Sequence, residues 1–315
     1  MQHYFLGEAI KKRRLELELT QEQLCEGICE PITISRLENG KQTPSRNRIN
    51  ALLERLDMPA DRYHALLSKN ELDVDALQRK ISSYNVRFRK ASAEEKPTIR
   101  ELALIAHKEL ESIIDENDTL SKQLILRSRV VLGTEDGDYS LNEKISMLIE
   151  AIRMTSPWFD LNDIGRGLYT TDEIKIINQL ASAYSKAGES MDAIGIWSQL
   201  HSYIRKHFSN IPLTRAHLNM VLLNYARELD VIGQFKKAIE IAEEGQQICL
   251  DYGHYLSLPG LLAVQAECHH FVGNDQKSKE LYCQAFYLTK VIGHEANLQL
   301  LRENAKRYLN LEFPD

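Results

Sequence analysis

The stretch Leu19-Thr20-Gln21-Glu22-Gln23-Leu24 and the later run Ile34-Ser35-Arg36-Leu37-Glu38-Asn39-Gly40 decide the fold of the first part of this chain. Thr20 followed by Gln23 is the pattern of a capping box, in which a hydroxyl and an amide side chain satisfy free N–H groups at a helix start. Pro31 suits the first turn of the next helix, and Asn39-Gly40 predicts its left-handed end. We therefore expect two short helices joined by a tight turn.

Apolar residues at helical spacing extend this pattern in both directions and predict five short helices in residues 1–67. The expected inward-facing residues are Leu6, Ile10 and Leu17 in the first helix, Leu24, Cys25 and Ile28 in the second, Ile34 and Leu37 in the third, Ile49, Leu52, Leu53 and Leu56 in the fourth, and Tyr63, Leu66 and Leu67 in the fifth. Ser45 and Asp61 are the expected caps of the last two helices. Such an arrangement is a helix-turn-helix domain.

These two runs resemble the xenobiotic-response-element (XRE) family of helix-turn-helix proteins, which includes the phage repressors. In two respects the sequence departs from that family. The turn between the second and third helices is one residue shorter than the commonest pattern, and Cys25 occupies the usual position of a small residue. With Glu26-Gly27-Ile28-Cys29, the short turn is instead similar to that of the peptide-responsive Rap–NprR–PlcR–PrgX group and the related Rgg regulators.

The resemblance implies that the third helix reads the major groove of DNA. Because Ile34 and Leu37 are expected in the core, Ile32, Thr33 and Arg36 share the outward face. Arg36 can donate two hydrogen bonds to guanine, and Ile32 and Thr33 can contact thymine methyl groups. Gln21, Asn39, Lys41 and Ser45 are the expected phosphate contacts. Arg14 and Glu38 match the family's structural ion pair, which orients the third helix.

Composition supports a helical chain and leaves DNA binding to local charge. Fifteen Gly and eight Pro are few among 315 residues, which favours long helices over sandwiches, barrels or doubly wound sheets. The net charge is −6, and residues 1–67 contain ten Lys and Arg against ten Asp and Glu. DNA binding must therefore depend on where the charges lie, since their sum is not basic.

Residues 68–78 are polar and are expected to form a linker into a long helix that continues to about Arg89, followed by a helix from Thr98 to about Ile114. Beyond them the chain repeats a pattern of small residue, turn glycine and small residue. Its three copies are Ala181, Gly188 and Ala193; Ala226, Gly233 and Ala238; and Ala266, Gly273 and Ser278. Residues 119–155 form a weaker copy, and residues 295–310 a lone closing helix.

This pattern resembles the tetratricopeptide repeat (TPR), although its intervals of 45 and 40 residues exceed the usual value of about 34. The resemblance implies a TPR-like superhelix over residues 79–315 that binds a ligand and dimerises. The first helices of such repeats line a concave groove, where Asn side chains can hold a peptide backbone and Lys or Arg a carboxylate. The expected groove residues are Arg127, Lys175, Asn178, Gln179, Asn224, Arg227, Glu267, Arg302 and Lys306.

Several function classes lack support in the sequence. None of the common phosphate-binding, dinucleotide-binding or hydrolase motifs is present, so we expect no enzyme, no cofactor and no metal site. The five cysteines include no C-x-x-C pair, and no apolar run reaches the roughly 18 residues of a membrane span. These features favour a cytoplasmic protein, and the family resemblance implies a bacterial one.

The predicted function is therefore that of an all-α, homodimeric transcription regulator that binds operator double-stranded DNA. Resemblance to the peptide-responsive group implies control by a short signalling peptide, as in quorum sensing. Two alternatives remain open: a regulator whose repeats bind a partner protein, and a repressor of a phage or mobile element without a peptide ligand.

Overall fold

The computed structural model describes residues 6–58, 69–134, 137–207, 212–253, 255–293 and 295–314. Over these ranges the chain is helical and contains no β-strand, which confirms the expected all-α class. Its contacts divide it into two compact units, Met1–Ala183 and Tyr184–Asp315. This division falls at a different place from the boundary expected after residue 67, because the helix-turn-helix segment packs on later helices of its own unit.

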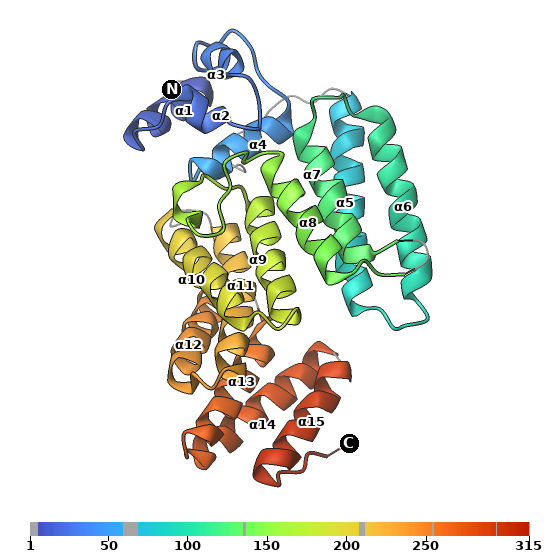
Figure 1. Ribbon diagram of the computed structural model, residues 1–315, viewed down its shortest axis with the longest axis vertical. Helices are drawn as coiled ribbons and strands as arrows, with labels where there is room; N and C mark the ends of the chain where they lie inside the picture. Colours follow the sequence, from blue (N-terminus) through green and yellow to red (C-terminus); the bar gives the residue numbers. More distant parts are fainter. Residues whose placement is uncertain are drawn as a thin grey trace. The chain divides into compact units, whose positions relative to one another are not determined.

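The first unit begins with the predicted short helices and continues with longer ones (Figure 1). Its helices are α1 (Leu6–Glu16), α2 (Gln21–Cys25), α3 (Pro31–Glu38), α4 (Arg46–Arg55), α5 (Lys69–Lys90), α6 (Lys96–Ile113), α7 (Thr119–Leu132), α8 (Leu141–Arg153) and α9 (Thr171–Lys186), whose last turn belongs to the second unit. The fifth helix expected around Asp61, Tyr63, Leu66 and Leu67 lies outside the described residues.

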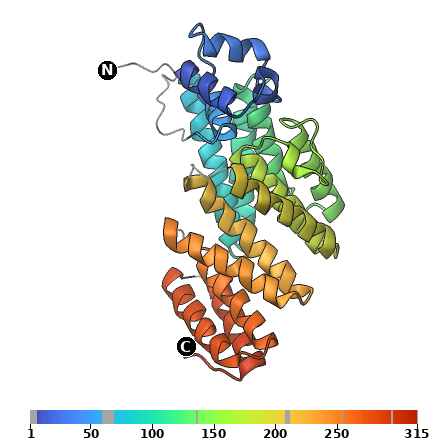
Figure 2. The ribbon, with the colours of Figure 1, turned by 90° about the vertical axis from the view of Figure 1, so that its left-hand side faces the viewer.

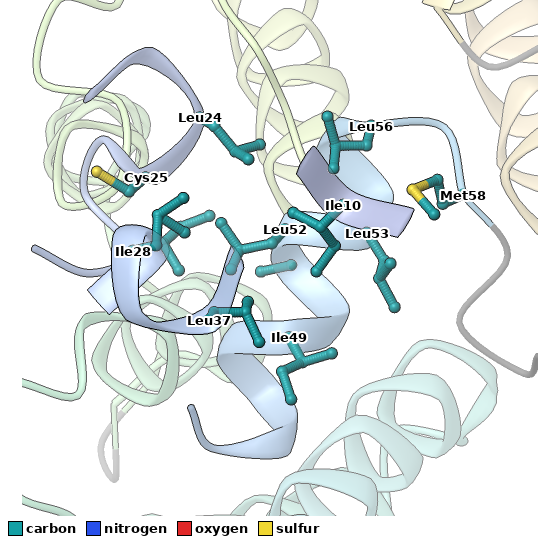
Figure 3. Packing of buried hydrophobic residues seen from close by; sticks show 12 residues of the cluster. Ile10, Leu24, Cys25, Ile28, Leu37, Ile49, Leu52, Leu53, Leu56 and Met58 are labelled. Carbon is teal, nitrogen blue, oxygen red and sulfur yellow. The ribbon is translucent and has the colours of Figure 1, made fainter. Parts of the chain in front are cut away.

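One apolar core holds α1 to α4 together. Ile10, Leu24, Ile34 and Leu52, one from each helix, are all fully buried. Side chains from different helices point toward one another in this core (Figure 3). Burying a Leu or Ile side chain contributes about 1.5–3 kcal/mol, so this cluster is what fixes the position of α3.

The local signals around α2 and α3 form as predicted. Thr20 Oγ1 accepts a hydrogen bond from the Gln23 N–H at 3.1 Å, and Gln23 Oε1 accepts one from the Thr20 N–H at 2.8 Å. Gly40 has φ +67°, which ends α3 in the left-handed region. Ser45 differs from the prediction: it is the N-cap residue of α4, but its hydroxyl makes no capping bond. The residue three places on is Arg48, which cannot complete a capping box because it has no acceptor.

The segment expected as a linker is helical. α5 begins at Lys69, so residues 69–78 are its first turns. Val74 is buried there in a second core, with Ile81 of α5 and Ala103 of α6, and this burial extends the helix through its polar neighbours. Asp75 lies within α5 and forms an ion pair with Arg79 one turn along the helix, at 2.7 Å.

Helical hairpins make up the second unit. Its helices are α10 (Ser190–His207), α11 (Pro212–Val231), α12 (Phe235–Tyr252), α13 (Leu258–Phe271), α14 (Asp275–Ile292) and α15 (Glu295–Leu309). α11 packs on α12, α12 on α13, α13 on α14, and α14 on α15 (Figure 2). The predicted turn glycines Gly188, Gly233 and Gly273 have φ of +85°, +77° and +82°. Residues with a Cβ rarely adopt this left-handed conformation, whereas glycine adopts it readily. The repeat signal therefore marked the true hairpin turns.

Small residues of the repeat pattern lie where paired helices approach most closely. Ala226 and Ala238 are fully buried in the hairpin α11–α12, and Ala266 and Ser278 in the hairpin α13–α14. The Ser278 hydroxyl donates a hydrogen bond to the Ala266 carbonyl at 2.6 Å, which joins the two helices of that hairpin directly. Short side chains allow this separation, as the sequence pattern predicted.

Candidate nucleic-acid interface

The outward face of α3 carries the three predicted base-reading residues. Ile32 is 56% exposed. Arg36 is also exposed, and its guanidinium donates a hydrogen bond to Gln42 Oε1 at 3.3 Å. Thr33 is half-buried. The inner face of the helix, Ile34 and Leu37, is buried, so α3 presents one apolar and one cationic side chain to the solvent.

A buried ion pair holds α3 against α1. Arg14 Nε donates to Glu38 Oε1 at 2.6 Å and Arg14 Nη2 to Glu38 Oε2 at 2.9 Å, which is the bidentate geometry of a strong pair. The hydrogen bond to Glu38 raises the pKa of the Arg14 guanidinium above its ordinary value. Arg14 Nη1 also donates to the Leu19 carbonyl at 2.8 Å. The pair that the family resemblance implied is therefore present.

Gln21 takes part in this pair. Its amide Nε2 donates to Glu38 Oε2 at 2.8 Å, so the side chain helps to place α3. The resemblance had suggested a phosphate contact for Gln21, and that contact stays a prediction. Asn39 likewise uses its amide within the protein, donating to the Ser35 carbonyl at the end of α3 at 2.7 Å. Lys41 is exposed and Ser45 half-buried beside them.

A second buried arginine joins the helix-turn-helix segment to the rest of the first unit. Arg55 at the end of α4 donates from Nη1 to the carbonyls of Leu24 at 3.0 Å and Glu26 at 2.7 Å. Its Nη2 donates to the Thr155 carbonyl at 3.0 Å and lies 3.6 Å from Glu173 Oε1. The Arg55 and Glu173 side chains are 2% and 0% exposed. We call the cluster of Arg55, Glu173 and Thr155 the Arg55 junction.

The other hydrogen-bond partners of Glu173 among the described residues are neutral. Its Oε1 accepts from the hydroxyls of Thr155 at 2.6 Å and Ser156 at 2.7 Å, and its Oε2 accepts from the Thr170 N–H at 2.6 Å. Arg55 therefore supplies the positive charge that compensates this buried carboxylate. Sequence reasoning missed the junction because its members are far apart in the chain and match no motif.

The backbone of Gly27 lies close to that of Thr155 at the same junction. Gly27, between α2 and α3, has φ +68°, and a Cβ placed on it would lie 2.2 Å from the Thr155 carbonyl oxygen. The Thr119 hydroxyl at the start of α7 donates to the Gly27 carbonyl at 2.7 Å. A cleft of about 420 Å³ opens beside this contact, and its lining includes Thr33 of α3 and Thr119 of α7. The turn before α3 is thus packed on α7 and on the segment after α8.

Glu54 beside the junction makes stability depend on pH. Its Oε2 accepts from the Thr171 N–H at 2.8 Å, and burial raises its pKa from the ordinary 4.5 to about 7. The folded state therefore holds this proton more tightly than the unfolded state. The stabilisation is full below about pH 4.5 and is lost as the pH rises through about 7.

Glu54→Gln, which cannot ionise, should flatten the fall in the free energy of unfolding between these two pH values. Urea unfolding at several pH values measures the change. Glu94→Gln, at an exposed position on the loop before α6, is the matched control and should keep the slope of the parent. An unchanged slope for Glu54→Gln would contradict the assignment.

In the first unit, the structure brings together two of the predicted groove residues. Asp172 Oδ1 lies 2.9 Å from Lys175 Nζ and 3.6 Å from a buried Arg127 nitrogen, so one carboxylate holds both cations. Asn178 is buried one turn further along α9, and Gln179 is half-buried beside it. These residues lie close together, and the single carboxylate of Asp172 is shared between the two cations.

The predicted groove residues of the second unit have separate surroundings. Asn224 is half-buried, and the Arg227 guanidinium lies over Gly260, where a Cβ would come within 3.2 Å of it. Glu267 accepts a hydrogen bond from the Tyr308 hydroxyl at 2.7 Å. Arg302 donates to the Pro314 carbonyl at 2.9 Å, and Lys306 pairs with Glu312 at 2.8 Å. The last two therefore contact the segment that follows α15.

Two searches of the described residues define what the molecule lacks there. No group of three or more His, Cys, Asp or Glu side chains is arranged to hold a metal ion. Among the helices placed by the structure, none has both the length and the apolar character needed to cross a membrane.

Comparison with known proteins agrees with this geometry. Residues 10–62 match the family model described as helix-turn-helix. A search of curated proteins returned no match. Among solved structures, the chain is similar to PlcR of Bacillus thuringiensis in complex with the peptide PapR7 and DNA, at 18% identity and a TM-score of 0.56 over 94% of this chain and 98% of that one. It is also similar to the apo form of PlcR, at 17% and 0.56 over 94% and 97%.

A third similar structure is the apo form of the competence regulator ComR from Streptococcus vestibularis, at 15% identity and a TM-score of 0.52 over 96% of this chain and 98% of that one. At these identities the likeness concerns the fold. The chain thus carries a helix-turn-helix domain followed by TPR-like hairpins, in the arrangement found in PlcR and ComR.

Proposed function

We propose that this chain is a sequence-specific transcription regulator that binds operator DNA as a homodimer and is controlled by a short signalling peptide bound by its TPR-like repeats. The observation that carries the proposal is the outward face of α3. It presents exposed Ile32 and Arg36 on a helix that the buried Arg14–Glu38 pair holds in place. A helix that is held by a buried ion pair and exposes a guanidinium suits major-groove recognition.

Size supports the dimer. A single helix-turn-helix offers few base contacts, whereas two copies related by a two-fold axis read half-sites about one helical turn apart or a multiple of it. The overall charge of −6 also supports this view, because non-specific attraction to phosphates is weak and specificity must come from paired base contacts.

Peptide control rests on the fold shared with a regulator solved in complex with a peptide and DNA. Within the first unit, the Arg55 junction joins the helix-turn-helix segment to the turn after α8 and the start of α9. A ligand that shifts α9, where Lys175 and Asn178 lie, would therefore act on the position of α3 through Glu173 and Arg55. Such coupling requires the ligand to bind one arrangement better than the other.

Arg36→Ala tests DNA binding by sequence. We expect it to lower the affinity for a duplex selected from a random library by about 10- to 100-fold, since a bidentate guanine contact is worth about 1–3 kcal/mol. It should also relax the preference at one position in each half-site. Gel shifts at two salt concentrations measure both effects.

Arg79→Ala on α5 is the matched control. The Arg79 side chain is 71% exposed and lies outside the proposed interface, so this variant should bind like the parent. If Arg36→Ala and the parent bind every selected duplex equally, the proposal for α3 fails. If DNA binding holds but no peptide changes it, the result favours a repressor of a phage or mobile element without a peptide ligand over the proposed peptide control.

A further inference from the structure

The chain that follows α15 turns back and contacts the surface of its own hairpin. α15 ends at Leu309, and Asn310 has φ +50°, in the left-handed region. The Asn310 N–H donates to the Lys306 carbonyl at 3.1 Å, the single bond of an αL helix end, and the Leu311 N–H donates to the Ala305 carbonyl at 3.2 Å. This local geometry directs residues 311–314 along α14 and α15 (Figure 2).

Three different kinds of contact hold residues 312–314. Glu312 Oε1 lies 2.8 Å from Lys306 Nζ, and this ion pair raises the pKa of Lys306 and lowers that of Glu312. The Phe313 ring stacks on Phe286 of α14 with centroids 4.2 Å apart and planes 3° apart. The Pro314 carbonyl accepts a hydrogen bond from Arg302 Nη2 at 2.9 Å.

Together these contacts define a small site with its own chemistry, which we call the Phe286 slot: Phe286, Arg302 and Lys306. The Arg302 guanidinium lies 5.4 Å from the centroid of the Phe286 ring, so the aromatic floor is flanked by two cations. Phe286 is fully buried in the presence of the segment that covers it. The slot therefore matches a carboxylate, an aromatic ring and a backbone carbonyl in consecutive residues.

Each contact is of a kind that a competitor can replace. The Lys306 and Glu312 side chains are 66% and 72% exposed, so solvent screens their attraction. Ring stacking and one carbonyl hydrogen bond are likewise available to any segment of the same chemistry. Residues 312–314 have the advantage that they are covalently attached to α15. A short attachment of this kind gives a local concentration in the millimolar range.

We propose that the Phe286 slot is a peptide-binding site for a short segment in which an acidic residue directly precedes an aromatic one, and that residues 312–314 occupy it as a resident competitor. The inference rests on the proposed peptide control and specifies the ligand class for one site in the second unit. Arg302 and Lys306, expected from the sequence to bind a peptide, already bind one here, supplied by the chain itself.

Binding of a blocked peptide with the sequence Asn-Leu-Glu-Phe-Pro, identical to residues 310–314, tests the proposal. The protein is the full chain, as the parent and as the opened variant Glu312→Ala with Phe313→Ala. Fluorescence anisotropy of the labelled peptide should show binding to the opened variant, with affinity at least about tenfold higher than for the parent because the tethered competitor is gone. Both substitutions lie outside any helix, and circular dichroism verifies that the fold is kept.

Matched ligands and variants make the result specific. A peptide with Ala in place of Phe should lose binding to the opened variant, and so should a peptide with Lys in place of Glu. Adding Lys306→Glu to the opened variant should restore binding of the Lys-containing peptide. Equal binding to parent and opened variant, no binding to the opened variant at millimolar peptide, or indifference to the Phe change would each overturn the proposal.

Gel shifts with the selected duplex separate this proposal from the proposed function. If the peptide binds the opened variant but leaves DNA binding unchanged, the Phe286 slot is upheld and peptide control through it is refuted. If DNA binding responds to another peptide while the labelled peptide does not bind the opened variant, peptide control is upheld and the slot proposal fails.

Discussion

Arg55→Ala is expected to destabilise the first unit by about 3–5 kcal/mol, because it leaves the carboxylate of Glu173 buried without its compensating charge. The side chain of Glu173 is 0% exposed, and its remaining partners are two hydroxyls and a backbone N–H. The substitution also removes the donors for the carbonyls of Leu24, Glu26 and Thr155. The midpoint and slope of urea unfolding, followed by circular dichroism, measure the loss.

Two further variants show whether the loss comes from charge. Arg48→Ala on the same helix removes a long hydrogen bond to the Asn117 carbonyl, at 3.4 Å on the surface, and should cost less than about 1 kcal/mol. Adding Glu173→Gln to Arg55→Ala should recover part of the stability, since no charge is then left uncompensated. An unfolding midpoint for Arg55→Ala equal to that of Arg48→Ala would exclude this account.

Arg14→Ala should also cost about 3–5 kcal/mol, in this case within the helix-turn-helix core. The Arg14 and Glu38 side chains are 9% and 2% exposed, and Glu38 would keep only the Gln21 amide as a side-chain partner. Because α3 then loses its anchor on α1, DNA affinity should fall although the Arg14 guanidinium is turned inward. Hydrogen exchange of the α3 amides measures the local loss, and gel shifts measure the functional one.

Comparison with Arg36→Ala distinguishes positioning from contact. Arg36→Ala should lose affinity with unchanged amide protection in α3, whereas Arg14→Ala should lose both together. Arg14→Lys should fall between parent and Arg14→Ala, because an ammonium group cannot make the two parallel bonds that Glu38 accepts. Full protection of α3 in Arg14→Ala would show that the apolar core alone holds the helix.

What the sequence predicted correctly depends mostly on short-range signals. Thr20 and Gln23 are three residues apart, and Gly188, Gly233 and Gly273 each end one helix and begin a turn. Such features need only neighbouring residues to form, so their residue types are informative by themselves. The Arg14–Glu38 pair was identified only through the family resemblance, because spacing alone does not reveal which charges meet.

The Arg55 junction and the Phe286 slot could not be predicted from the sequence, because their contacts join residues that no local sequence pattern relates. Arg55 at the end of α4 has the position of an ordinary C-terminal helix charge, and only packing buries it against Glu173. Arg302 and Lys306 were interpreted as groove residues because their helical spacing suited a TPR-like repeat. The left-handed turn at Asn310 that brings the chain back to them has no such spacing. The polar stretch at 69–78 was predicted as a linker because its buried residue, Val74, is isolated in sequence.

The Arg55 junction has a thermodynamic consequence for the order in which ligands bind. Arg55 donates to the carbonyls of Leu24 and Glu26 in the helix-turn-helix segment and to the carbonyl of Thr155 in the turn after α8. Suppose that DNA favours one arrangement of these groups and that an effector acts through the same groups. The factor by which the effector changes the affinity for DNA then equals the factor by which DNA changes the affinity for the effector. The DNA-bound protein and the protein free in solution would then respond to different concentrations of the same effector.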